Sequence, residues 1–320
     1  MKRPIVTANV ISMSGGKDST ATALLALERR VDNARFVFAD TGHEHPETLA
    51  YLDYLRDTLS IDIEVVRYDF SEKIAKKRAR ILDPDSDWPD HLRERALEVL
   101  HPSGNPMLDL CLWKGRFPST MARFCTQWLK STPIDEQITQ PILASKDFSR
   151  LVSWQGVRAD ESPARAKLEP WAMEMGDAET GEGLWVYRPI LEWSADDVFA
   201  MHRRHGIKWN PLYEQGMGRV GCMPCINARK GEIREIARRF PEEMERIAEW
   251  ERIVSDAAKR GCATFWPARG ETDVNLEKHG IHNIIAWSRT SRGGQQYDLE
   301  AMAEVDDEAP SCQSIYGLCE

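Results

Sequence analysis

The sequence predicts an α/β fold with a doubly wound, mainly parallel sheet, a helical insertion and a cysteine-bearing C-terminal region. Short apolar runs alternate with amphipathic segments, which favours parallel strands covered by helices on both faces. A glycine-rich turn directly follows the first apolar run. The length of 320 residues is enough for one large domain and a smaller region.

The first predicted strands alternate regularly with helices. Residues 5–11 form an apolar run typical of a buried strand, and residues 19–30 then carry Ala and Leu at helical spacing. Residues 34–39 predict a second strand, Pro46 lies near the start of the next helix, and residues 61–68 predict a third strand.

The later part of the chain is less regular. Prolines interrupt residues 71–123, which we interpret as a helical insertion with loops near the mouth of a binding site. Residues 151–157 predict a further strand, and residues 177–183 predict an exposed acidic loop. Ser194 is expected to cap a helix. Apolar residues at helical spacing within 232–259 predict one long helix or two.

The overall composition restricts the class of protein. A net charge of −9 argues against a surface covered in positive charge for wrapping nucleic acid, but 42 Lys and Arg are enough for a local basic groove. Residues 76–80 and 289–292 are candidates for that groove, with a solvated helix face or loop as the alternative. No stretch approaches the roughly 18 apolar residues of a membrane span, and residues 1–4 lead into a strand rather than a signal peptide. We therefore expect a cytoplasmic protein, in which seven cysteines point to metal, cluster or redox chemistry before disulfides.

The glycine turn Ser14–Ser19 has the composition of a phosphate-binding loop. Gly15 and Gly16 permit a tight turn and present N–H groups to phosphate oxygens, and the positive end of the following helix adds to the attraction. Lys17 can neutralise phosphate charge, and the two serines can donate hydroxyls. Asp18 would repel phosphate, so it is expected to position the loop or to help hold Mg²⁺. The spacing differs from the Walker A motif, and a plain strand-to-helix turn is the structural alternative.

Further motifs follow this loop in an order that resembles the phosphoadenosine phosphosulfate (PAPS) reductase family of PP-loop, adenine nucleotide alpha-hydrolase-like enzymes. The motifs are Asp40–Thr48, Arg123–Thr126 with Lys130, Gly156–Arg158 with Glu161, Ser162 and Arg165, Arg188–Ile190 with Trp193 and Asp197, Asn210–Tyr213, and Gly221–Cys225. The resemblance spans about residues 5–230, and residues 104–125 further resemble phage- and prophage-encoded members. It implies a nucleotide-binding domain over residues 1–215, with the insertion at about 71–123, and a helical C-terminal region over residues 216–320.

The resemblance also implies roles for individual residues. Asp40 and Gly42 would lie beside the adenosine, and Arg158 and Arg165 would hold phosphate or sulfate oxygens, with surface salt bridges to Asp160 and Glu161 as the alternative. The candidate nucleotide-binding residues are Ser12, Ser14, Gly15, Gly16, Lys17, Asp18, Ser19, Asp40, Thr41 and Gly42, and the candidate catalytic residues are Lys17, Asp18, Arg158 and Arg165.

The resemblance leaves two activities to be separated. It implies that dedicated reductases often carry an altered glycine loop, whereas members that split ATP into AMP and pyrophosphate keep the intact loop that this chain has. Such enzymes adenylate an oxygen that sulfur then displaces, chiefly by positioning and by charge neutralisation through Mg²⁺, loop amides and Lys17. The prediction is an ATP pyrophosphatase for sulfur transfer, in a nucleic-acid modification such as DNA phosphorothioation. A PAPS or APS reductase, and a non-catalytic nucleotide-binding subunit of a modification complex, are the alternatives.

The cysteines predict a metal centre. Cys222 and Cys225 are separated by two residues, as ligands of one centre often are, and Cys312 and Cys319 in the tail supply two more thiolates. The resemblance favours a 4Fe–4S cluster over zinc. In one alternative Cys125 replaces a tail cysteine, although the adjacent-cysteine pattern of that family region is incomplete here. In another, Cys319 is a mobile nucleophile or persulfide carrier, or the thiols are inert.

The expected partners follow from this chemistry. They are ATP or a related adenylyl nucleotide, a sulfur donor such as a cysteine desulfurase, and a nucleic-acid target. No membrane partner is expected.

Overall fold

The strands of the protein form one six-stranded sheet. The computed structural model describes residues 5–145, 147–268 and 272–290, and within them the strand order is β3-β2-β1-β4-β6-β5. The strands are β1 (Thr7–Met13), β2 (Ala34–Ala39), β3 (Ile63–Val66), β4 (Arg150–Trp154), β5 (Trp171–Asp177) and β6 (Glu182–Tyr187). Every neighbouring pair is parallel except β5 and β6, so the predicted mainly parallel α/β fold is confirmed.

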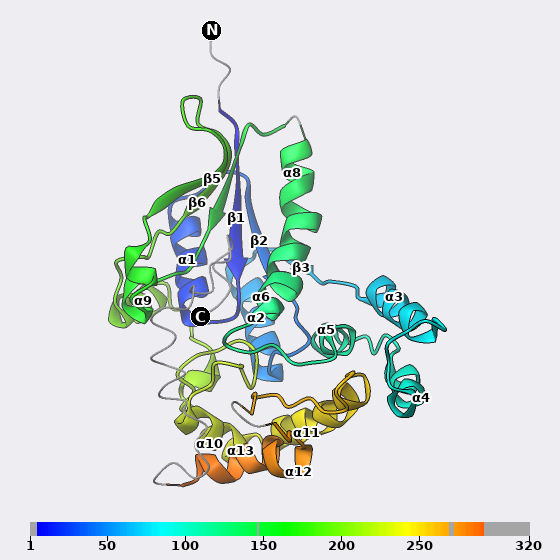
Figure 1. Ribbon diagram of the computed structural model, residues 1–320. Helices are drawn as coiled ribbons and strands as arrows, with labels where there is room; N and C mark the ends of the chain where they lie inside the picture. The colour runs from blue at the N-terminus through cyan, green and yellow to red at the C-terminus, as the bar shows by residue number, and fades with distance from the viewer. Residues whose placement is uncertain (1–4, 146, 269–271, 291–320) are drawn as a thin grey trace.

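Helices cover both faces of the sheet and one end of it (Figure 1). They are α1 (Lys17–Glu28), α2 (Pro46–Leu59), α3 (Ser71–Leu82), α4 (Asp90–Val99), α5 (Pro106–Lys114), α6 (Phe124–Thr126), α7 (Thr132–Ile134), α8 (Gln140–Ala144), α9 (Ala195–Arg204), α10 (Lys230–Arg239), α11 (Pro241–Asp256), α12 (Leu276–His279) and α13 (Ile281–Ser288). None of the described helices is long and apolar enough to cross a membrane.

The sheet has a separate hydrophobic core on each face, because successive side chains along a strand point to opposite faces. Ile11 and Met13 of β1 pack into a core with residues of α1, α2 and α9. Ala8 and Val10 of the same strand pack into the opposite core, which helical residues between 134 and 142 complete. Helices on both faces are what the doubly wound prediction requires.

One helical rod spans residues 124–144 beside the sheet (Figure 1). It joins α6, α7 and α8 through two stretches of wider π-helical turns, Gln127–Ser131 and Asp135–Thr139. Its buried residues Ile134, Ile138 and Ile142 recur every fourth position, so they form one stripe against the sheet. The sequence analysis did not predict this rod.

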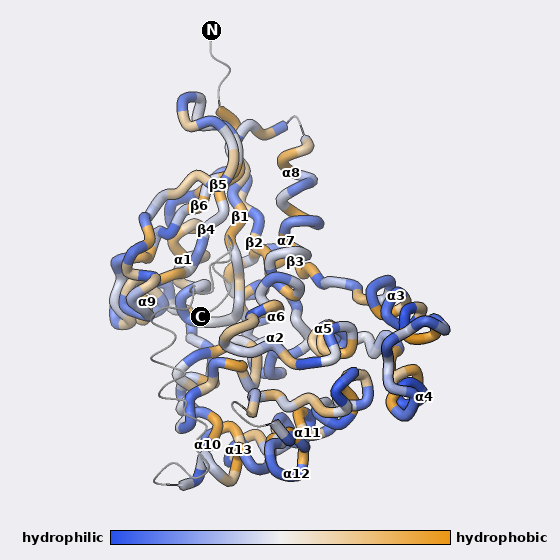
Figure 2. The backbone as a smooth tube through the Cα atoms, in the orientation of Figure 1, coloured by the Kyte–Doolittle hydropathy of each residue, from blue (hydrophilic) through white to orange (hydrophobic). Residues whose placement is uncertain are grey.

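A second group of helices packs beyond the carboxyl ends of the central strands (Figure 1). Ile74 of α3 and Leu110 of α5 share a hydrophobic core with Ile236 of α10 and Ile247 of α11. The predicted insertion and the predicted C-terminal region therefore share one core. The tube of α3 and α4 is largely hydrophilic where these helices project from the body (Figure 2).

Several predicted boundaries agree with the structure, whereas the strands predicted at 5–11, 61–68 and 151–157 lie at Thr7–Met13, Ile63–Val66 and Arg150–Trp154. The strand 34–39 and the helix start at Pro46 are as predicted, and Ser194 caps α9. Residues 177–183 are not a free loop, because they form the end of β5, an exposed turn and the start of β6 in an antiparallel hairpin. The segment 232–259 contains two helices, divided at Phe240 before a proline that cannot continue the first.

Candidate nucleotide and thiol site

The topology places the glycine loop at the point where the strand order reverses. Strands β2 and β3 lie on one side of β1, and β4, β6 and β5 lie on the other. In such sheets ligands bind beyond the carboxyl ends of the strands at this switch point. The loop Ser14–Ser19 follows β1 and Gly156 follows β4. A Cβ on Gly156 would lie 2.9 Å from the Asp18 carbonyl carbon and the Ser19 nitrogen, so the two loops are in direct contact.

The glycine loop is closed by its own hydroxyls. Gly15 has a φ of +75°, and a Cβ there would lie 2.6 Å from the Thr48 side chain, so the turn requires glycine. The Ser14 hydroxyl accepts the Gly16 N–H at 3.3 Å and lies 3.0 Å from the Ser19 hydroxyl. Helix α1 begins immediately afterwards at Lys17, which gives the loop the helix N-terminus that favours phosphate.

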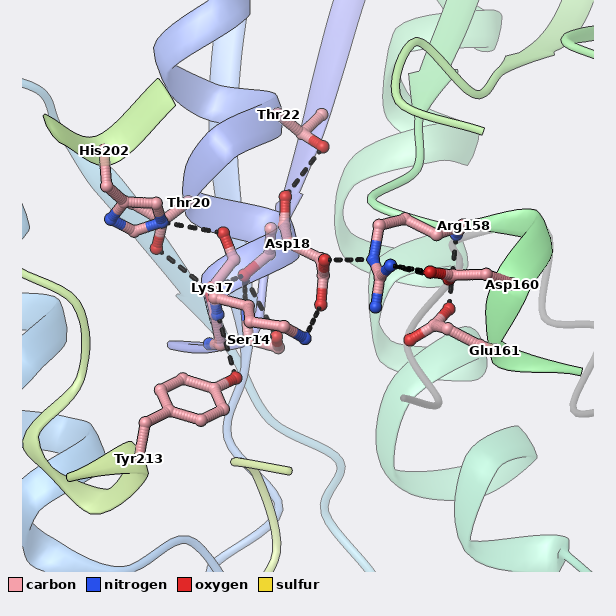
Figure 3. Close-up of polar contacts among 12 residues, drawn as sticks. Ser14, Lys17, Asp18, Thr20, Thr22, Arg158, Asp160, Glu161, His202 and Tyr213 are labelled. Atoms are coloured by element: carbon pink, nitrogen blue, oxygen red, sulfur yellow. Dashed lines mark hydrogen bonds and ion pairs between the residues drawn. The ribbon is translucent and has the colours of Figure 1, made fainter. Parts of the chain in front are cut away.

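Asp18 lies at the centre of the loop's charge network (Figure 3). Its carboxylate is fully buried, with one oxygen 2.5 Å from the Lys17 Nζ and the other accepting the Arg158 Nε–H at 2.7 Å. Both oxygens are thus taken by cations. Of the two roles expected for Asp18, the geometry supports positioning of the loop, and the role as a Mg²⁺ ligand stays a prediction.

The two arginines expected to hold phosphate lie on the other wall. Arg158 also pairs with Asp160 at 2.6 Å, and Arg165 pairs with Glu161. These are the salt bridges considered as the alternative. Both arginines are buried, at 6% and 9% exposed, and Glu161 is largely buried, whereas the Asp160 side chain is half exposed. The Glu161 carboxylate also accepts the Arg158 backbone N–H, which fixes the turn after β4.

Residues that follow the sheet brace the glycine loop from the opposite side. The Tyr213 hydroxyl accepts the Lys17 N–H at 3.0 Å, and the Asn210 side chain donates to the Gly15 carbonyl at 3.1 Å. His202 Nε2 donates to the Lys17 carbonyl at 2.9 Å. No sequence motif pointed to His202. The Asn210–Tyr213 motif was the only sequence signal for this brace.

The end of β2 forms the next part of the site. Asp40 accepts the Gly42 N–H at 2.8 Å and is paired with Arg67, while Gly42 has a φ of +69°. Glu44 is buried, and its carboxylate accepts both the N–H and the hydroxyl of Thr41, at 3.1 and 2.7 Å. The motif therefore folds into a tight turn that carries Thr41 towards the glycine loop.

The three cysteines Cys125, Cys222 and Cys225 line one cavity of about 70 Å³. Ser14 of the glycine loop and Thr41 line the same cavity. Its other polar lining residues are His43, Arg123, Thr126, Lys130, Arg219 and Asn227. The predicted phosphate-binding loop and the predicted metal-binding cysteines therefore meet in space, although more than 100 positions separate Ser14 from Cys125 in the sequence.

Hydrogen bonds attach the Cys222–Cys225 segment to the turn after β2. The Met223 N–H donates to the His43 carbonyl at 2.9 Å, and the His43 Nε2 donates to the Pro224 carbonyl at 2.8 Å. Cys222 Sγ lies 3.6 Å from the Thr41 hydroxyl. Burial, with the nearby Arg246, lowers the pKa of His43 to about 3, so this histidine is neutral and its ring is a fixed structural link.

The electrostatics of the cavity keep two of its thiols, Cys222 and Cys125, protonated. Burial raises the pKa of Cys222 to about 12 and that of Cys125 to about 11, although the Lys130 ammonium opposes both shifts. Burial lowers the pKa of Lys130, but the neighbouring Cys222 and Glu44 reverse this and leave it raised. The cavity thus holds the Lys130 ammonium beside two thiols, those of Cys222 and Cys125, that are weak nucleophiles at neutral pH. The sequence analysis did not identify Glu44, Arg123 or Arg219 as site residues.

The structure describes only part of the predicted set of metal-binding cysteines. Cys312 and Cys319 lie outside the described residues. Among the described residues, no three His, Cys, Asp or Glu side chains have an arrangement that could hold a metal ion. Cys125 does lie with Cys222 and Cys225, as in the alternative that included it, but these three alone do not form a metal site.

The remaining nucleotide-site prediction concerns the end of β1. The Ser12 hydroxyl is buried and, among the described residues, has no hydrogen-bond partner. It is therefore a polar group beneath the loop that the described chain leaves unsatisfied.

Similarities to known proteins agree with this geometry. Residues 8–228 match the phosphoadenosine phosphosulfate reductase domain. A 37.8 kDa protein of Escherichia phage 186, described as uncharacterized, is 49% identical over 98% of this chain and 97% of its own length. An adenosine 5′-phosphosulfate reductase of Neisseria meningitidis serogroup B is 34% identical over 70% of this chain and 72% of its own. Protein MJ0973 of Methanocaldococcus jannaschii is 27% identical over 72% of this chain, which spans only 44% of that protein.

Proposed function

Because the chain belongs to the phosphoadenosine phosphosulfate reductase family, we propose that it splits ATP into AMP and pyrophosphate and so adenylates an acceptor for sulfur transfer. The observation that carries this proposal is the shared cavity. Ser14 of the glycine loop lines the same 70 Å³ cavity as the three thiols. An adenylylated product formed at the loop would therefore lie next to sulfur chemistry.

The glycine loop supplies the groups that pyrophosphate release requires. An acceptor oxygen attacks the α-phosphorus, the bond to the bridging oxygen breaks, and pyrophosphate leaves with the electron pair. Lys17, Arg158 and the N-terminus of α1 are placed to stabilise the charge that develops on the phosphate oxygens. The proposal leaves Mg²⁺ to the triphosphate itself, because both Asp18 oxygens are already paired.

The sulfur step follows at the thiol cavity. A persulfide, delivered by a donor such as a cysteine desulfurase, attacks the activated phosphorus and displaces AMP, and a thiol reductant then cleaves the S–S bond, which leaves the sulfur on the acceptor and oxidises the two thiols to a disulfide. We propose a nucleic-acid phosphate as the acceptor, as in DNA phosphorothioation. A phosphate oxygen is a weak leaving group until it is adenylated, which is why ATP is consumed.

Cys222 and Cys225, with Cys125 as the alternative to one tail cysteine, are proposed as ligands of an iron–sulfur cluster or, as the alternative, zinc. Cys222 and Cys125 have raised pKa values and are poor free nucleophiles, whereas metal coordination replaces the thiol proton. Cys312 and Cys319 of the tail are the proposed additional ligands. Iron, sulfide and zinc analysis after anaerobic purification should show loss of metal in Cys222→Ser but not in Cys262→Ser, and a wild-type protein without bound metal would overturn this assignment.

Pyrophosphate release from ATP tests the activity directly. We expect release by the full chain with a sulfur donor and single-stranded DNA, and a loss of roughly 100-fold or more in Lys17→Ala, because one positioned charge contributes a few kcal/mol to such a transition state. Lys208→Ala, at an exposed cation, is the control.

Two other outcomes would replace this proposal. The similarity to a protein named adenosine 5′-phosphosulfate reductase favours sulfonucleotide reduction as the second candidate. Thioredoxin-dependent sulfite formation from APS or PAPS, with no pyrophosphate from ATP, would establish it. Tight ATP binding without turnover under any of these conditions would instead indicate a nucleotide-binding subunit.

A further inference from the structure

A second and larger cavity lies on the helical layer, outside the nucleotide and thiol site. It has a volume of about 650 Å³ and lies between α3, the end of α5 and the segment that follows α11. Thirteen of the described residues line it; eight of these are Lys or Arg, two are Trp, and Asp87 is the only acid among them. We call this cavity the basic groove. Its charge contrasts with the net charge of −9 of the whole chain.

Several of these cations have no acidic partner. Within residues 5–145, 147–268 and 272–290, Lys73, Lys114 and Arg116 make no ion pair with a carboxylate. The ammonium of Lys73 lies 4.3 Å from the centre of the Trp128 ring, and that of Lys114 lies 3.9 Å from the centre of the Trp113 ring. An aromatic face stabilises a cation without cancelling its charge, so this charge is left for an anionic ligand.

The cations are also crowded together. Burial, and then the nearby Arg116 and Lys73, lower the pKa of Lys114. Like charges held this close repel one another in the free protein. A ligand with several negative charges at regular spacing would relieve that repulsion, whereas a single phosphate would neutralise only part of it.

The helical rod 124–144 contacts two cations of the basic groove and contributes residues to the thiol cavity. Arg116 lies 5.5 Å from the centre of the Phe124 ring, and Lys114 lies 5.7 Å from the centre of the Trp128 ring. These two aromatic residues are four positions apart on one helical rod, and therefore on one side of it. Cys125 and Lys130 of the same rod line the thiol cavity. Neighbouring residues of one rod thus contact the groove cations and line the thiol cavity.

We propose that the basic groove binds single-stranded nucleic acid, with the cations contacting successive phosphates and the tryptophans contacting bases. Positive grooves combined with aromatic side chains are the usual means of holding an unpaired strand. The cavity is concave and within the size range that encloses a small ligand, so an extended strand fits it better than the convex surface of a duplex. The binding is independent of ATP chemistry. Only the added role, holding the acceptor of sulfur beside the thiol cavity, rests on the function proposed above.

Binding of a fluorescein-labelled oligothymidylate to the full chain, measured by anisotropy without ATP, tests the proposal. Lys114→Glu combined with Arg116→Glu should weaken binding about 10-fold or more. The slope of log affinity against log salt should fall by about 1.4, because two phosphate contacts are lost. Arg234→Glu combined with Lys278→Glu makes the same change of charge at exposed residues that do not line the groove, and should have a much smaller effect.

Asp87→Asn provides a test that misfolding cannot imitate. It removes the only acid lining the groove, which is paired with Lys259, and should tighten binding. The proposal is overturned if the wild type does not bind the single strand at low salt, if the groove and control variants lose affinity equally, or if a duplex of the same length binds more tightly. Strand binding without pyrophosphate release would overturn the proposed function alone, and release without strand binding would overturn the groove alone.

Discussion

Replacing Asp18 by Asn tests whether one buried carboxylate holds the glycine loop in place. The Asp18 side chain is 0% exposed, and its partners Lys17 and Arg158 are 11% and 7% exposed. Asparagine keeps the shape but removes the charge, which leaves two buried cations without their shared counterion. Breaking a buried ion pair by removing one partner costs about 3–5 kcal/mol, and this carboxylate serves two pairs. We therefore expect the free energy of unfolding to fall by at least about 3 kcal/mol.

Asp160→Asn is the matched control. Asp160 pairs with the same Arg158 guanidinium, but its side chain is 51% exposed, so water replaces the lost interaction. Exposed pairs contribute about 0–1 kcal/mol, and we expect a loss of that size. Urea unfolding followed by tryptophan fluorescence measures both variants on one scale. The difference is large compared with the total of about 5–15 kcal/mol that stabilises most folded proteins.

The result that refutes this reasoning is a similar loss in both variants, or a loss below about 1 kcal/mol for Asp18→Asn. Either would mean that the loop is held by its hydroxyls and by Tyr213 rather than by charge. A second measurement separates stability from function. ATP at about 100 times its dissociation constant should raise the free energy of unfolding of the wild type by about 2.7 kcal/mol.

Three further predictions concern other parts of the site. Gly156→Ala should weaken ATP binding about 10-fold or more, because its Cβ would lie 2.9 Å from the backbone of the glycine loop. Gly218→Ala, which has open space around it, should leave the ATP affinity unchanged, and isothermal titration calorimetry measures both variants. Burial raises the pKa of Cys222 to about 12, so in metal-free protein at pH 8 iodoacetamide should label this thiol far more slowly than an ordinary thiol, as followed by mass spectrometry. Lys130→Met should slow the labelling of Cys222 further, because the Lys130 ammonium lowers the pKa of this thiol. Rapid labelling of Cys222 at pH 8 would contradict this prediction. Burial lowers the pKa of His43 to about 3, so below about pH 6.5 the unfolded chain binds a proton that the folded chain does not. The free energy of unfolding should therefore fall between about pH 6.5 and pH 3, by up to roughly 1.4 kcal/mol per pH unit. In His43→Gln the urea midpoint should fall less steeply with decreasing pH, and a slope identical to that of the wild type would count against the assignment.

Local patterns in the sequence were sufficient for the elements that make the nucleotide loop. The strand 34–39, the helix from Pro46 and the capped helix after Ser194 follow from apolar periodicity and capping, which depend on neighbouring residues. The same patterns gave the strand, glycine turn and helix around Ser14–Ser19. Because the sheet is parallel, they also implied that the loops after its strands share one edge.

The contacts that build the thiol cavity could not be found in this way. Cys125 and Cys222 line the same cavity because the rod 124–144 packs against the sheet. The stripe of Ile134, Ile138 and Ile142 shows which side of the rod is buried, but it does not specify the partner against which that side packs. His202 contacts the glycine loop through a single backbone hydrogen bond, for which no sequence pattern exists. Tertiary proximity of this kind is decided by packing over long sequence separations.

The brace behind the glycine loop links the two halves of the site thermodynamically. Residues 210–225 begin with Asn210 and Tyr213, which hold the loop backbone, and end with Cys222 and Cys225, which are fastened to the turn after β2. If occupation of the loop shifts this run of chain, the affinity of the thiols for their own ligand changes. Reciprocity then requires that the state of the thiols changes nucleotide affinity by the same factor. The nucleotide affinity, measured with and without a ligand bound to the thiols, would therefore report the state of the thiols.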